Sequence, residues 1–72
     1  MLEDLLKAEE WAREVRRRMA DWAFIESQPP RLREALKYLV ERGDLRVAAK
    51  LAGMGVDELA DVAKQANIPT AP

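Results

Sequence analysis

The chain has 72 residues, of which 49% are hydrophobic and 35% charged, with 12 basic and 13 acidic side chains. This length allows one small domain. Because the chain has no Cys and no His, zinc sites, thiol nucleophiles, disulfides and imidazole acid–base chemistry are excluded. The net charge of −1 excludes nucleic-acid binding by overall charge, so any such binding needs a local basic patch. No apolar run approaches the roughly 20 residues that span a bilayer, and we expect a cytoplasmic protein that makes no membrane contact.

Apolar residues recur at helical spacing along the whole chain, and no segment shows the alternation typical of a β-strand. We therefore predict an all-α fold in a single domain, 1–72. A long amphipathic helix at 1–26 is followed by a helical unit at 30–68. Since a chain of this size buries only about 60% of its unfolded surface, a partner subunit is expected.

The predicted N-terminal helix carries an apolar stripe with alternating steps of four and three residues. This heptad pattern is typical of a helix that pairs with another helix. We expect the helix to be longer than the other three can cover, and therefore to form a homodimer. The alternative is that it packs along its own bundle and frays at its start. The pattern leaves open whether two such helices run parallel or antiparallel. The predicted dimerisation residues are Leu5, Ala8, Trp11, Ala12, Val15, Met19 and Trp22.

Three shorter helices are predicted after Pro29-Pro30, with boundaries at Gly43-Asp44 and at Gly53. The last two of them, at 45–64, have the pattern of a helix-turn-helix. Such a motif needs small residues where its helices cross and a glycine in its tight turn. Ala48, Ala49 and Ala52 supply the small residues, and Gly53 supplies the turn. The alternative is an ordinary pair of antiparallel helices with a glycine break.

Positive charge is concentrated in the middle of the chain, where residues 31–50 hold six basic and three acidic side chains. Basic residues beside a helix-turn-helix can contact the phosphates of duplex DNA. The second helix of the motif is acidic, which disfavours base reading by that helix. A solvated basic face is the alternative, and the run Arg16-Arg17-Arg18 is also interpreted as solvated. The candidate nucleic-acid-binding residues are Arg42, Arg46, Lys50, Lys64 and Gln65.

The segment RVAAKLAGMGVDELADVAKQANIP resembles a family of small prokaryotic antitoxins with an alanine-rich helix-turn-helix followed by Ile-Pro. Gly55 stands where the family usually has a serine. The resemblance covers about 24 residues of the C-terminal half. It implies a DNA-associated antitoxin whose protein partner is a PIN-domain ribonuclease toxin. The matching residues are Ala48, Ala49, Ala52, Gly53, Met54, Leu59, Ile68 and Pro69.

An enzyme is not expected, because catalysis would depend on carboxylates, Lys50 or Tyr38, and four short helices can hardly form a substrate pocket around them. No cofactor or metal site is predicted. Two hypotheses remain: a dimeric DNA-associated regulator or antitoxin, and a protein–protein interaction module that keeps the helix-turn-helix fold without binding DNA. Salt dependence separates them, since phosphate contacts weaken steeply with salt.

Overall fold

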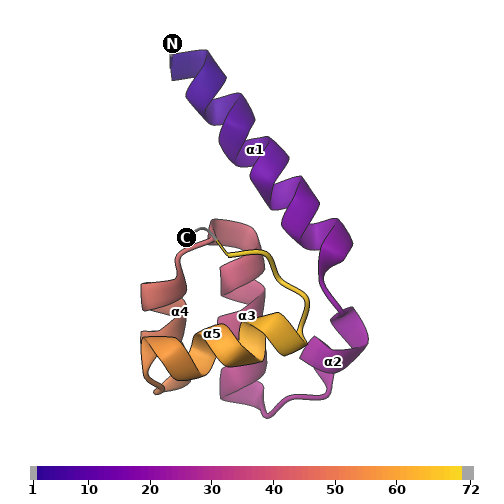
Figure 1. The fold of residues 1–72 in the computed structure, drawn as a ribbon, viewed down its shortest axis with the longest axis vertical. Coiled ribbons are helices and arrows are strands. Elements are labelled where there is room, and N and C mark those ends of the chain that lie inside the picture. The colour runs from indigo at the N-terminus through magenta and orange to yellow at the C-terminus, as the bar shows by residue number, and fades with distance from the viewer. Residues whose placement is uncertain (1, 71–72) are drawn as a thin grey trace.

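The computed structural model describes residues 2–70, and within them the fold is all-α, as predicted. A long N-terminal helix extends from a compact group of shorter helices (Figure 1). The molecule is therefore elongated, with extents of 39 × 23 × 19 Å. The helices are α1 (Leu2–Met19), α2 (Trp22–Glu26), α3 (Pro30–Arg42), α4 (Leu45–Ala52) and α5 (Val56–Gln65).

The long helix predicted at 1–26 is instead two helices, because the chain turns at Ala20 and Asp21. The Asp21 carboxylate accepts a hydrogen bond from the Phe24 N–H at 3.0 Å, which makes it the N-cap of α2. Ala20 is buried in the core. The prediction was wrong here because the apolar spacing continues through the break. Met1, the first residue of the predicted helix, lies outside the described residues.

The predicted three-helix unit is α3, α4 and α5, in which α4 packs against both of the others. Its core is contributed by all three helices and is closed by α2 and by the segment after α5. The largest side chains with no exposed surface are Ile25, Leu36, Leu39, Val40 and Leu59. Burying such side chains is the main driving force for folding a chain of this size.

The ends of α3 and α4 are set by two glycines in the left-handed conformation. Gly43 has a φ of +71° and donates its N–H to the Leu39 carbonyl at 2.8 Å. Gly53 has a φ of +69°, and the N–H groups of Gly53 and Met54 bond to the Lys50 and Ala49 carbonyls. This second pattern is a Schellman motif. Both predicted glycine boundaries are confirmed.

The end of α5 is tied to the junction between α1 and α2. Asn67 has a φ of +57° and donates its side-chain N–H to the Met19 carbonyl at 2.8 Å. The Asp21 N–H donates to the Ala66 carbonyl at 2.7 Å. These two bonds provide partners for backbone groups that the break in the helix leaves without an intrahelical bond.

Arginines attach the C-terminal half of α1 to the C-terminal end of α3. Nε of Arg16 donates to the Val40 carbonyl at 2.7 Å, and Nε of Arg13 donates to the Glu41 carbonyl at 3.0 Å. These are carbonyls that the end of a helix leaves free, and the helix dipole favours a cation there. The interpretation of Arg16-Arg17-Arg18 as solvated was therefore wrong for Arg16, whereas Arg17 is exposed and pairs with Glu41.

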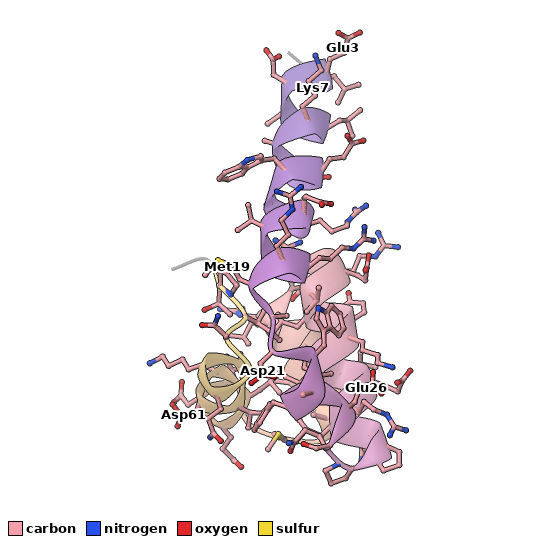
Figure 2. All side chains as sticks on the ribbon, turned by 90° about the vertical axis from the view of Figure 1, so that its right-hand side faces the viewer. Glu3, Lys7, Met19, Asp21, Glu26 and Asp61 are labelled. Carbon is pink, nitrogen blue, oxygen red and sulfur yellow. The ribbon has the colours of Figure 1, made fainter. Side chains whose placement is uncertain are left out.

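The N-terminal half of α1 has no such attachment. Every residue from 2 to 11 is exposed, and α1 as a whole has no buried residue. Figure 2 shows Glu3 and Lys7 on the part of α1 that stands clear of the other helices. Helix α1 therefore packs against its own chain along its C-terminal half only, and both the dimer and the alternative remain open for the N-terminal half.

Candidate nucleic-acid interface

The turn motif consists of α4, the three residues 53–55, and α5. Asp44 begins α4, and its carboxylate accepts a hydrogen bond from the Val47 N–H at 3.1 Å. Gly53 ends α4, and Nε of Arg31 donates to the Leu51 carbonyl at 2.7 Å. The guanidinium of Arg31 lies so close to Gly53 that a Cβ there would be 3.0 Å from it. The turn is thus fixed by backbone conformation and by a side chain from α3.

Small residues allow α4 to approach its neighbours closely. Ala48 and Ala49 are 0% and 1% exposed, and Leu59 anchors α5 in the same core. Met54 is half-buried at the corner and packs against this core. The predicted roles of the alanines, the glycine and the apolar anchors in the turn are all found in the structure.

Three of the five candidate nucleic-acid-binding residues lie close along the chain on α3 and α4, and we call them the basic row: Arg42, Arg46 and Lys50. All three are exposed, and none makes an ion pair within residues 2–70. Arg46 and Lys50 are four residues apart on α4 and therefore share one face of that helix.

The other basic residues of the segment 31–50 are engaged with neighbouring groups. Lys37 lies 3.0 Å from a Glu26 oxygen, and Arg33 lies 3.9 Å from a Glu34 oxygen. Arg31 is hydrogen-bonded to the end of α4. Since these three have intramolecular partners, the basic side chains of the segment 31–50 that make no such contact are those of the basic row.

Lys64 and Gln65 do not join the basic row. Both are exposed near the end of α5. Lys64 lines a groove of about 270 Å³ that also contains Met19 and Pro69, on the side of the molecule where α1 ends. Arg42 lines a separate cleft of about 230 Å³ with Arg13 and Glu9. Lys64 and Arg42 thus line different hollows of the surface.

The second helix of the motif, α5, presents acid rather than base. Asp57, Glu58 and Asp61 are exposed, against a single basic residue, Lys64. Figure 2 shows Asp61 on the outer side of α5. Asp57 and Glu58 lie in the first turn, where their negative charges interact favourably with the helix dipole. They also repel phosphates at the end of the helix that would read bases.

The ion pair that joins α1 to α3 perturbs both of its partners. Arg17 bonds Glu41 through two nitrogens, at 2.7 and 2.9 Å. This hydrogen bonding lowers the pKa of Glu41 and raises the pKa of Arg17. Desolvation between the helices lowers the pKa of Arg16. These charges attach α1 to α3, and Arg16 and Glu41 line the same cleft as Arg42.

The predicted dimerisation residues on α1 form a surface that is largely open. Leu5, Ala8, Trp11 and Met19 are exposed, whereas Ala12 and Val15 are half-buried. A groove of about 330 Å³ runs beside them, lined by Trp11, Ala12, Val15, Arg16, Pro69 and Thr70.

Trp22 does not belong to that surface. It lies on α2, after the break, and its indole N–H donates to the Arg17 carbonyl at 2.9 Å. Its predicted place on the heptad stripe was therefore wrong.

Sequence reasoning missed the arginines that cap α3 and α4. Arg16 and Arg31 each lie against a left-handed glycine and donate to a carbonyl 24 or 20 residues away in the chain. The glycines could be predicted from the sequence, but nothing in it assigns one arginine to each. No group of acidic side chains within residues 2–70 is arranged to hold a metal ion. Within the same residues, no helix is long and apolar enough to cross a membrane.

Comparisons with protein-family models, with curated proteins and with solved structures find no match to this chain. The similarity to small antitoxins therefore stays a prediction.

Proposed function

We propose that this protein is a non-enzymatic DNA-associated regulator that contacts the backbone phosphates of duplex DNA through the basic row. The observation that carries the proposal is that Arg42, Arg46 and Lys50 are exposed beside a helix-turn-helix and have no ion-pair partner within residues 2–70. Exposed guanidinium and ammonium groups without an ion-pair partner can bind phosphate without first breaking an intramolecular ion pair. Their binding also releases counterions from the duplex.

The charge of α5 defines what kind of DNA contact is proposed. Its exposed Asp57, Glu58 and Asp61 make reading of bases by α5 unfavourable, whereas phosphate contacts position a protein without specifying sequence. We therefore propose binding with little sequence preference, in which α4 rather than α5 faces the duplex backbone.

Replacing the basic row together, as Arg42→Gln, Arg46→Gln and Lys50→Gln, tests this proposal. We expect the variant to lose retention on a short labelled duplex at about 50 mM salt, with its helix content unchanged. In the wild type, each phosphate contact contributes about −0.9 to the slope of log K against log salt. The variant Lys7→Gln, Arg33→Gln and Lys37→Gln removes the same charge elsewhere and should retain the wild-type slope.

A second function is favoured by the acidic surface of α5 and by the apolar side chains that α1 leaves exposed. In this alternative the chain is a protein–protein interaction module that does not bind DNA. The antitoxin resemblance names one such partner class, a PIN-domain ribonuclease. Absence of wild-type retention at about 50 mM salt would contradict the DNA proposal and favour this one. An antitoxin must in addition suppress the activity of a copurified ribonuclease.

A further inference from the structure

The N-terminal half of α1 exposes more apolar surface than its own chain covers. Leu2, Leu5 and Trp11 are 71%, 65% and 70% exposed. Together these side chains expose apolar area on the order of several hundred Å², a size at which patches on proteins usually mark an interaction site. The surface therefore calls for a partner whose shape and charge the structure can identify.

The charge of α1 is divided between its two halves. Residues 2–11 hold four acidic side chains and one basic one, a net charge of −3. Residues 12–19 hold four arginines and one glutamate, a net charge of +3. The C-terminal half stays net positive beside α3, because the single carboxylate of Glu41 offsets only one of its four arginines. A second α1 running in the opposite direction is therefore complementary in charge along its whole length.

We propose that two copies of this chain associate through an antiparallel pair of α1 helices. The apolar stripe restricts the register to two arrangements. Positions 5, 12 and 19 are of one heptad type and positions 8 and 15 of the other, and antiparallel helices pair one type with the other. Of the two registers that pair four of these five positions, the one that covers Leu5, which is more exposed than Met19, places Leu5 opposite the partner's Val15 and Ala8 opposite the partner's Ala12.

The groove beside α1 accommodates this register. Its walls include Ala12, Val15 and Pro69, and its volume is about 330 Å³. Leu5 of the other copy would enter this groove, since it is the residue placed opposite Val15. Leu5 of each copy would thus fill the open groove of the other copy, and the two-fold symmetry makes this contact twice.

Charged groups at the edge of the pair favour the same direction. In this register Asp4 comes near the partner's Arg18, whose side chain is 78% exposed and has only an i,i+4 contact with Glu14. A parallel pair would instead set the two halves of net charge −3 side by side, and likewise the two halves of +3. Like charges at that spacing are destabilising, so the antiparallel direction is favoured.

Sedimentation of three proteins tests the association. We expect the wild type to sediment at twice the 8.2 kDa chain mass at about 100 μM. Leu5→Glu should raise the dissociation constant at least about 100-fold, because it places a carboxylate opposite the partner's Val15. Leu5 is exposed in one copy, so the variant should keep its helix content. Leu6→Glu makes the same change off the stripe and should remain dimeric. A monomeric wild type would overturn the proposal.

Disulfide trapping tests whether the two α1 helices run antiparallel. No native cysteine competes with the introduced ones, because the chain has none. Leu5→Cys and Val15→Cys should each stay uncrosslinked alone and form a covalent dimer when mixed. In the proposed register two copies of residue 5 are about 15 Å apart along the axis. A disulfide requires Cα atoms within about 4.4–6.8 Å. The yield of covalent dimer from the mixture should therefore exceed the yield from either variant alone by about tenfold.

The matched control is a mixture of Lys7→Cys and Glu14→Cys, which lie at nearly the same height as the test pair but on the polar face. It should not crosslink. Crosslinking of Leu5→Cys alone would show a parallel pair and overturn the proposed direction. Absence of crosslinking in the test mixture would overturn it as well. Neither result depends on DNA, so failure here is distinguishable from failure of the proposed function.

Discussion

Helix α1 and the unit α3–α5 are both amphipathic, yet only the second has a core of its own. The three helices of the unit are short, and left-handed residues at their ends fold them back on one another. Helix α1 runs 18 residues without a buried side chain. The difference teaches that apolar periodicity predicts which face of a helix seeks cover, whereas helix length and end geometry decide whether the same chain can provide it.

The attachment of α1 illustrates a second difference between these regions. Within the unit, apolar side chains fill the space between helices. Between α1 and α3, the contacts are hydrogen bonds from Arg13, Arg16 and Arg17 to the end of α3. Partly exposed charged bonds of this kind contribute less than buried apolar area, so α1 is held more weakly than the unit is held together.

Replacing a buried leucine should break the unit, whereas replacing an exposed one should not. We expect Leu39→Ala to lower the free energy of unfolding by about 2–5 kcal/mol, because Leu39 is fully buried between helices. Leu6→Ala, at a side chain 52% exposed, should change it by less than about 0.5 kcal/mol. Urea unfolding followed by circular dichroism measures both. Equal losses would mean that α1 is covered as well as α3.

The turn of the unit should be sensitive at one glycine and tolerant at the next. Gly53→Ala should cost about 1–2 kcal/mol, since Gly53 is left-handed and a Cβ there meets the Arg31 guanidinium. Gly55 has a φ of −68° and is the N-cap of α5. Gly55→Ser should therefore leave stability equal or slightly higher. Thermal unfolding compares the two, and an unchanged midpoint for Gly53→Ala would contradict the turn geometry described above.

The smallest expected effect concerns the ion pair between α1 and α3. Arg17 lowers the pKa of Glu41 in the folded state, so this carboxylate stabilises the fold above its unfolded pKa, near 4.3. The contribution is lost as the pH falls through the lower folded pKa. The pair is exposed, so Glu41→Gln should cost at most about 1 kcal/mol at neutral pH.

The test is the difference in free energy of unfolding between wild type and Glu41→Gln, measured at neutral pH and at about pH 3. It should shrink toward zero in acid and in high salt. A difference that is constant with pH would show that the carboxylate charge does not contribute to this attachment.

Much of the unit could be predicted from the sequence, because its signals are local. Pro30, Gly43, Asp44 and Gly53 fix helix ends through their own backbone preferences, and the structure places ends at each of them. The break at Asp21 was missed because aspartate also occurs on the polar side of a continuous helix. No local feature of the sequence indicates that Ala20 is buried in the core.

The candidate site was less predictable than the fold. Exposure of Arg46 and Lys50 follows from their place on α4, but the separation of Lys64 from them depends on how α5 crosses the unit. The role of Arg16 depends on a carbonyl 24 residues away. Long-range pairings of this kind are decided by packing and have no local signal in the chain.

Amide hydrogen exchange along the chain, followed at increasing dilution, tests the central comparison most directly. The account predicts that amides of residues 5–11 lose protection on dilution, while those of Leu39 and Val40 stay protected, because only the second group is covered by its own chain. Protection of both groups to the same extent in dilute protein would contradict the account, since it would mean that the N-terminal half of α1 needs no partner.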